Sequence, residues 1–512
     1  MKLAVCLCLQ FAICNALESR EGKKILWAVM VHGGAHMIVA RTISKVLKAK
    51  GHNVTFLAYD SDKVNTTNLQ SYMRVRGQND DGSLLLADET GKFIYPYAAI
   101  WSESKLDIYN SLLLFLQTPE FMCRAVLDDP NVIERISREK FDLAIVDYTS
   151  NGCIYALMHR LNIPYVSVIL SKGFDQTVFP QNPATVGVLL SRLSEPSNVF
   201  ERAFNLAAFI VSRLGTALYN WMSSIHIWRR IPDSPSMAQL VENSEHTFIL
   251  HDYFVDETKQ FPDDSSLVGC YMCRPPKPLE TDLQTFMDEA KSVVIISFGY
   301  SYTKPGIFPD RLWNGIMGMA RKFSDQGVKV LMSFPGQPAE LPGNMRVEPW
   351  LSMMDVLGHP KTRVFISQCG GGSVMESLYN GVPVVGIPLF GDHFEMCALL
   401  RRRGLGHTLN KMNVDANILT ETITDIFNDR EMEKRLKNVS SLMHDISPFS
   451  LQNIVDQIDH ISHHNSVTDG LRLHTARYNS WEVYMLDQLL FFVFFWCVSK
   501  IGLGICHQKM NA

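Results

Sequence analysis

The first half of the chain alternates continuous apolar runs with helically spaced ones. Residues 25–31 are uniformly apolar, which is typical of a strand buried in a parallel sheet. Residues 37–48 carry apolar side chains at helical spacing, and Gly51 is suited to ending that helix. Residues 53–58 form a second apolar run, and 141–170 repeat the pattern. This order predicts βαβ units, which imply a parallel sheet.

A second α/β pattern follows the proline-rich stretch RPPKP at 274–278. Its predicted elements are strands at 292–299, 327–334, 362–367 and 382–388 and helices at 312–323 and 373–379. The predicted fold is therefore α/β, with two doubly wound, Rossmann-like domains, 17–272 and 273–465, that face a cleft. Residues 446–465 are expected to form a return helix. Ligands of such sheets bind at the carboxyl ends of strands.

Two apolar, aromatic segments, 108–122 and 198–228, interrupt the first α/β pattern. Either could form ordinary core helices. Either could instead line an apolar pocket or rest on a membrane. The residue pattern alone leaves these alternatives open.

Both ends of the chain carry targeting patterns. Residues 1–16 have the charged start, apolar region and small-residue end of a secretory signal, although a buried first strand has a similar pattern. Residues 486–506 have the length of one transmembrane helix, which would leave 507–512 as a short cytosolic tail; a docked apolar helix is the alternative. Glycosylation sequons fit a lumenal protein and lie at Asn53, Asn65 and Asn438.

Charge and cysteine content narrow the function further. The net charge of −4 gives no support to nucleic-acid binding, which calls for a basic face.

Of the eleven cysteines, three lie in the signal and two in or beside the C-terminal segment, which leaves six. Six are too few for a disulfide scaffold. Cys270 and Cys273 lack the second ligand pair of a structural zinc site, so they are expected to be a local disulfide or two thiols.

A glycine turn follows the predicted strand 362–367. The order strand, Gly370–Ser373, helix places exposed backbone N–H groups at a helix N-terminus, where an anion such as phosphate binds. Glu376, one turn further, is suited to accepting hydrogen bonds from ribose hydroxyls. The combination indicates a nucleoside diphosphate, and a tight packing turn is the alternative.

The stretch from Trp350 to His393, WLSMMDVLGHPKTRVFISQCGGGSVMESLYNGVPVVGIPLFGDH, resembles the signature of the UDP-glycosyltransferase family. The resemblance extends over nearly the whole chain. It implies the two-domain GT-B fold and inverting transfer of a sugar from a UDP-sugar to a hydroxyl of a small lipophilic acceptor. It also implies that the enzyme uses no metal and no cofactor besides the UDP-sugar co-substrate. The catalytic part is expected to be lumenal and anchored in the endoplasmic reticulum membrane by a single span. A homo- or hetero-oligomer is a possible assembly.

The resemblance also assigns a donor site. Its residues are Ser297, Gly299, Tyr300, Trp350, Gln368, Gly370, Gly371, Gly372, Ser373, Glu376, Asp392 and His393. Trp350 aligns with the tryptophan that stacks on uracil, and Glu376 with the ribose-binding acid. Asp392 and His393 align with the Asp-Gln pair that holds the donor sugar.

The resemblance assigns catalysis to His36 as the base and Asp147 as its partner acid. The residues agree with this, because His36 opens a predicted helix, whose dipole disfavours an imidazolium, and Asp147 ends a predicted strand. His32 is the competing base. A metal site made of the two histidines is less favoured, because no nearby acid or cysteine completes it.

Three departures from the family pattern bear on the donor. Met353 replaces the expected glutamine after Trp350, Gln368 replaces the histidine before the glycines, and His393 replaces the last glutamine. They keep open a second function, a catalytically weakened UDP-sugar-binding or partner subunit. A nicotinamide-dependent oxidoreductase is less consistent, because G-x-G-x-x-G is missing after either first strand.

The donor is expected to be a neutral hexose. Glucose comes first on the breadth of the family, and galactose is favoured by His393, which resembles a galactosyltransferase branch. Glucuronic acid is less favoured, because the signature has no additional basic residue for its carboxylate.

Overall fold

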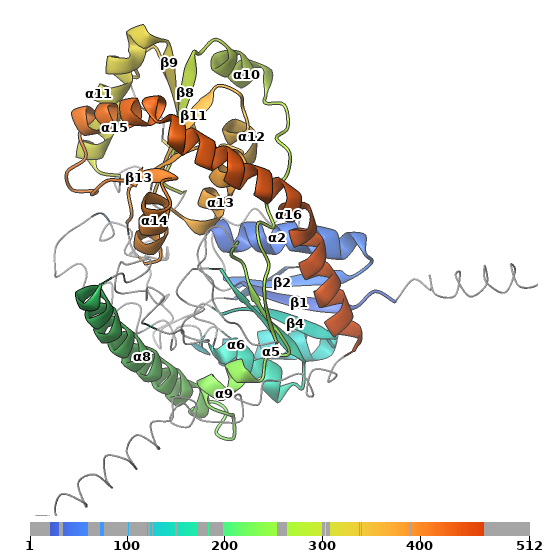
Figure 1. Cartoon of the computed structure of the whole chain (residues 1–512). Coiled ribbons are helices and arrows are strands. Elements are labelled where there is room, and N and C mark those ends of the chain that lie inside the picture. The colour runs from blue at the N-terminus through green and yellow to red at the C-terminus, as the bar shows by residue number, and fades with distance from the viewer. Residues whose placement is uncertain are drawn as a thin grey trace, which may run out of the picture.

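In a computed structural model of this chain, each half contains one parallel sheet (Figure 1). The structure describes residues 21–29, 34–59, 72–75, 126–148, 152–170, 198–252, 264–299, 308–336, 340–389 and 391–464, with isolated positions between them. The predicted signal and the predicted span 486–506 lie outside these residues. Within the described part, no helix combines the length and the apolar character needed to cross a bilayer.

The first sheet has the order β3-β2-β1-β4-β5-β6-β7. Its strands are β1 (Lys24–Val29), β2 (Asn53–Tyr59), β3 (Tyr72–Val75), β4 (Leu143–Asp147), β5 (Tyr165–Ile169), β6 (Thr247–Ile249) and β7 (Ser265–Leu267). The described helices of this half are α2 (Gly34–Ala49), α5 (Pro130–Glu139), α6 (Gly152–Arg160), α8 (Val199–Trp228) and α9 (Met237–Glu242). All neighbours pair in parallel, and β1 and β4 are almost wholly buried, as their apolar runs predict.

The second sheet has the order β10-β9-β8-β11-β12-β13. Its strands are β8 (Ser292–Ser297), β9 (Val328–Ser333), β10 (Met345–Glu348), β11 (Thr362–Ser367), β12 (Val384–Gly386) and β13 (Gly406–Thr408). Its helices are α10 (Thr281–Asp288), α11 (Asp310–Phe323), α12 (Met353–Leu357), α13 (Gly371–Tyr379), α14 (His393–Arg402), α15 (Ala416–Asn428) and α16 (Arg430–His463).

The strand order reverses between β1 and β4 in the first sheet and between β8 and β11 in the second. This confirms the doubly wound topology for both halves. In such sheets the crevice at the reversal point, outside the carboxyl ends of the strands, binds the ligand. The segments that leave these four strands are therefore the expected ligand-binding segments.

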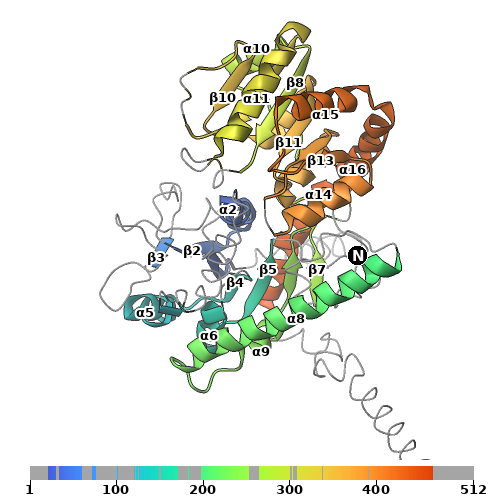
Figure 2. The same ribbon diagram turned by 90° about the vertical axis from the view of Figure 1, so that its left-hand side faces the viewer.

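The predicted apolar segment 198–228 folds as α8, a single 30-residue helix on the outside of the first half (Figure 2). Asn198 begins it, since its side chain accepts from the backbone N–H groups of Phe200 and Glu201. One side carries buried residues such as Ile227, whereas Phe200 is 83% exposed and many other apolar side chains face outward. Only one side of this segment thus belongs to the core.

The return helix is much longer than 446–465 predicts. α16 runs from Arg430 to His463 and contains Pro448. It packs against α13 in the second half and then against α2 in the first (Figure 1). The chain therefore crosses between the halves twice, once through the linker and once through α16.

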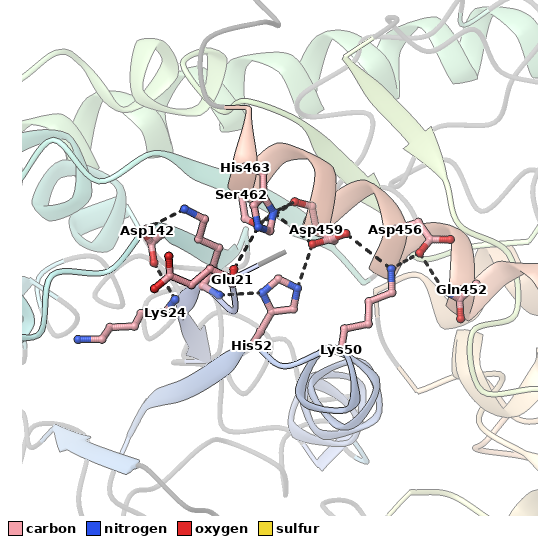
Figure 3. A network of polar contacts seen from close by, with 11 residues as sticks. Glu21, Lys24, Lys50, His52, Asp142, Gln452, Asp456, Asp459, Ser462 and His463 are labelled. Atoms are coloured by element: carbon pink, nitrogen blue, oxygen red, sulfur yellow. Dashed lines mark hydrogen bonds and ion pairs between the residues drawn. The ribbon is translucent and has the colours of Figure 1, made fainter. Parts of the chain in front are cut away.

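A network of hydrogen bonds and ion pairs connects the end of α16 to the first half (Figure 3). His52 is buried and its Nε2 lies 3.2 Å from Asp459 Oδ1, while Lys50 contacts both Asp456 and Asp459. The backbone N–H of Lys23 donates to His52 Nδ1, so the ring hydrogen sits on Nε2 and faces Asp459. Burial lowers the pKa of His52 despite that carboxylate. The ring therefore makes this contact in its neutral form.

The six cysteines outside the two terminal segments form three disulfides, Cys123–Cys153, Cys270–Cys273 and Cys369–Cys397. Of the two alternatives for Cys270 and Cys273, a local disulfide or two thiols, the structure has the disulfide. The other two pairings were not predictable, since the remaining four cysteines allow three connectivities.

Candidate active site

His36 and Asp147 meet at the carboxyl edge of the first sheet. β1 and β4 are neighbouring parallel strands, so the segments that leave them are also neighbours. Asp147 is the last residue of β4, and His36 lies in the first turn of α2. His36 Nδ1 contacts Asp147 Oδ2, and both side chains are largely buried. An ionised carboxylate only accepts hydrogen bonds, so it keeps the hydrogen on Nδ1 and leaves Nε2 as the basic nitrogen.

The charge around His36 differs from the sequence-based expectation. Burial lowers the pKa of His36, but the carboxylate of Asp147, its hydrogen bond to the ring and the charge of Asp392 more than offset this and raise the pKa above 6.5. The expected lowering by the helix dipole is thus outweighed by two acids. Asp392 belongs to the second half, so the two halves face each other at His36. His32, the competing base, lies outside the described residues.

The glycine turn lies at the carboxyl end of β11, next to β8 in the second sheet. Gly370 precedes α13 in an extended conformation, and no side chain caps the helix. The backbone N–H groups of Gly371, Gly372 and Ser373 therefore point out of the helix end without a side-chain acceptor. A Cβ on Gly372 would lie 2.8 Å from Met272 Cε, so the Met272 side chain packs close to the turn. This is the geometry of an anion site.

Gln368 is buried beside the turn. Its Oε1 accepts from the Ser367 hydroxyl at 3.2 Å, and its Nε2 lies 3.1 Å from the position that a Cβ on Gly370 would take. The amide therefore turns its donor group toward the glycines. Gln368 can supply hydrogen bonds to an anion at this turn, although it carries no charge.

Glu376 lies one turn into α13 and is half-buried. Burial raises the pKa of Glu376 to about 8; the nearby Asp355 adds to the shift and Arg274 opposes it. Arg274 is itself bound to Asp355 through two hydrogen bonds of 2.7 and 3.0 Å, which weakens its effect on Glu376. Burial therefore favours the protonated form of Glu376 in the free protein.

The other donor-site candidates follow two strands of the second sheet. Trp350 follows β10 and is 60% exposed, which leaves its ring face accessible. Ser297 ends β8, and Gly299 has a φ of 76°, a conformation that favours glycine. Tyr300 lies outside the described residues. The loop after β8 thus leaves the sheet beside the strand that carries the turn.

Asp392 and His393 stand at the start of α14. His393 is buried, and burial lowers its pKa to about 3, so the ring is neutral at physiological pH. Asp392 is partly exposed, and its charge acts on His36 of the first half. Within the described residues, no group of three or more His, Cys, Asp or Glu side chains is placed to hold a metal ion.

His251 is a residue that the sequence reasoning missed. It follows β6 of the first half and is wholly buried. Its Cε1 lies 3.9 Å from the position that a Cβ on Gly371 would take, so the ring reaches the first residue of α13. The only sequence signal was a histidine directly after a short apolar run, which is common in proteins.

Comparison with known proteins agrees with this geometry. Residues 23–507 match the family described as "UDP-glucoronosyl and UDP-glucosyl transferase". The chain belongs to this family. As a UDP-dependent glycosyltransferase it is 25% identical over 506 residues to human 2-hydroxyacylsphingosine 1-beta-galactosyltransferase, covering 95% of this chain and 90% of that protein. It is 24% identical to UDP-glucosyltransferase 2 of Dactylopius coccus (97% and 96% covered) and to human UDP-glucuronosyltransferase 2B7 (97% and 94% covered).

Solved glycosyltransferases share the fold of this UDP-glycosyltransferase. The calicheamicin glycosyltransferase CalG4 superposes with a TM-score of 0.56 at 16% identity, covering 87% of this chain and 99% of CalG4. Medicago truncatula UGT71G1, solved with UDP-glucose, gives a TM-score of 0.53 at 16% identity and covers 86% and 99%. The GT-B arrangement of two parallel sheets is therefore confirmed.

Proposed function

We propose that this UDP-dependent glycosyltransferase moves a hexose from a UDP-hexose to a hydroxyl of a small lipophilic acceptor, with inversion and without a metal ion. One observation carries the proposal. The His36–Asp147 pair of the first half lies close enough to Asp392 of the second half for the charge of Asp392 to act on His36, which supports a base and a sugar-binding acid at one site. The alternative, a catalytically weakened binding subunit, is less consistent with an intact pair.

Each step uses residues already described. His36 Nε2 removes the proton from the acceptor hydroxyl as that oxygen attacks the anomeric carbon. Asp147 stabilises the imidazolium that forms. UDP leaves from the opposite face of the sugar, and its charge is stabilised by the N–H groups and dipole at the start of α13. Trp350 stacks on uracil, and Glu376 binds the ribose.

The test combines binding and product analysis. UDP-hexoses should raise the melting temperature of the protein, and an α-linked donor should give a β-linked product in NMR spectra. Stabilisation by NAD alone would contradict the assignment. Binding of UDP-hexose without turnover of any acceptor in a broad lipophilic panel would favour the binding-subunit alternative.

Glucose and galactose differ at the 4-hydroxyl, and we expect Asp392 and His393 to contact this group. A neutral imidazole and an amide present hydrogen-bonding groups at different reach, and a wrong epimer leaves polar groups unpaired. We expect His393→Gln to change the ratio of initial rates with UDP-glucose and UDP-galactose by about fivefold or more. In the unmodified enzyme, the initial rates with UDP-glucose and with UDP-galactose should both exceed the rate with UDP-glucuronate. Unchanged ratios would show that His393 does not select the donor.

UDP binding is expected to release a proton from Glu376. The pKa of this carboxyl is about 8, and a ribose that donates hydrogen bonds to it favours the ionised form. Affinity for UDP should therefore rise between pH 7 and 9, where the phosphates are already ionised. Calorimetry in two buffers of different ionisation enthalpy measures the release, which Glu376→Gln should abolish. A pH-independent affinity would contradict the role.

We also propose that the enzyme is a single-pass protein of the endoplasmic reticulum membrane with a lumenal catalytic part. Three disulfides fit an oxidising compartment, and Asn438 is exposed on α16. The protein should remain in membranes after carbonate extraction, and its Asn438 glycan should resist external glycosidase. Release of the intact chain by carbonate would contradict the span.

A further inference from the structure

The Cys369–Cys397 disulfide joins the two parts of the donor site. Cys369 stands directly before Gly370 of the glycine turn. Cys397 lies in α14, the helix that begins with His393. Both cysteines are buried, and 28 residues separate them in the sequence. The bond therefore links the turn to the sugar-side helix from behind, where it cannot touch a substrate.

The surrounding structure accommodates this bond specifically. A Cβ on Gly386, at the end of β12, would lie 2.3 and 2.4 Å from the sulfurs of Cys397 and Cys369, so only glycine leaves room. Cys369 has a φ of 66°, an uncommon conformation for a residue with a side chain. Its N–H donates to the Ser367 hydroxyl at 3.3 Å. The backbone at this point is shaped around the linked sulfur.

α14 also contacts the turn directly. Met396 Cε lies 3.8 Å from the position that a Cβ on Gly371 would take. On the far side of the bond, the Thr408 hydroxyl donates to the Cys397 carbonyl at 3.1 Å. The disulfide and these contacts together hold α14 at one distance from the start of α13.

The donor makes that distance functionally important. Diphosphate and hexose are joined covalently, so the turn and the start of α14 must bind their portions at a fixed separation. UDP alone carries no hexose, so its binding does not use the start of α14. Loosening the separation should therefore weaken UDP-hexose binding much more than UDP binding.

We propose that Cys369–Cys397 is a positioning disulfide that presets the distance between the diphosphate turn and the sugar-binding helix. The proposal rests on the proposed function of this site. It makes the two cysteines positioning residues rather than catalytic ones. It also distinguishes this bond from the Cys123–Cys153 bond, which closes a similar span of 30 residues in the first half.

The test compares two double variants of the full chain, Cys369→Ala with Cys397→Ala and Cys123→Ala with Cys153→Ala. Both should lower the melting temperature, because both remove a disulfide of similar loop length. Only the first should raise KM and Kd for the UDP-hexose about tenfold or more, with Kd for UDP and KM for the acceptor changed less than about threefold. An unchanged ratio of UDP to UDP-hexose affinity would overturn the proposal.

A second measurement needs no variant. If the disulfide strengthens UDP-hexose binding, UDP-hexose must protect the disulfide by the same factor. The unmodified protein is treated with dithiothreitol, then alkylated, and labelled Cys369 and Cys397 are quantified by mass spectrometry. UDP-hexose should protect them more than UDP does, and equal protection would overturn the proposal. If the unmodified protein neither binds nor turns over any UDP-hexose, the proposed function itself fails.

Discussion

Replacing His36 with alanine is expected to lower kcat by at least about a hundredfold, because the acceptor hydroxyl loses its general base. UDP affinity should change little, because the base belongs to the first half and the UDP site to the second. Steady-state rates with saturating UDP-hexose and acceptor measure the first effect. Calorimetric titration with UDP measures the second and also shows that the variant is folded.

His32→Ala is the matched control, since it removes a neighbouring histidine of the same segment. It should retain near-normal turnover. If His32→Ala abolishes transfer while His36→Ala keeps it, the base has been assigned to the wrong residue.

The pH profile distinguishes a base from a residue that only supports the structure. The pKa of His36 is raised above 6.5, so the acid limb of the kcat/KM profile should also lie above pH 6.5. Activity is lost as the pH falls through the pKa of His36, because the protonated ring cannot accept a proton. Asp147→Asn removes the charge that raises the pKa, so this limb should move to lower pH while kcat falls. If the acid limb does not move, Asp147 does not set the pKa of the base.

The second large effect is expected for Trp350→Ala. Loss of stacking on uracil costs about 1–3 kcal/mol, so Kd for UDP should rise about 5- to 150-fold. The ring is 60% exposed, so its removal opens little core and the melting temperature should hardly change. Isothermal titration with UDP and thermal unfolding of the same samples measure both quantities.

Trp221→Ala provides a control of equal chemistry. Trp221 lies on α8 and is 57% exposed, nearly the same fraction as Trp350. Its removal should leave UDP affinity unchanged. Equal Kd values for UDP in the two variants would show that Trp350 does not stack on uracil.

Local pattern was sufficient to predict where several candidate site residues lie in the fold. The βαβ order places His36 and Asp147 at the ends of neighbouring strands, and parallel pairing of β1 with β4 then brings them together. The strand, glycine and helix order placed the N-terminus of α13 in the same way. These predictions succeeded because they depend on short segments and on the single hand of βαβ units.

Long-range contacts could not be predicted in this way. Pro448 suggests a helix boundary, yet α16 continues through it and packs on both halves. The side-chain cap of Asp429 marks the true start, since it accepts from the N–H of Met432. His251 reaches Gly371 only through the placement of one half on the other. Against burial, Asp147 is the main cause that raises the pKa of His36, and the additional raising by Asp392, far away in sequence, likewise needs the two halves together.

The attachment of α16 has a consequence for the exchange of domains between relatives. Because Asp456 and Asp459 meet Lys50 and His52, the first domain is completed by the last turns of a helix that belongs to the second by sequence. A chimaera joined only at the linker would place buried His52 against a foreign partner. The first domain is therefore a discontinuous unit, and a compatible graft carries both its N-terminal portion and the end of α16.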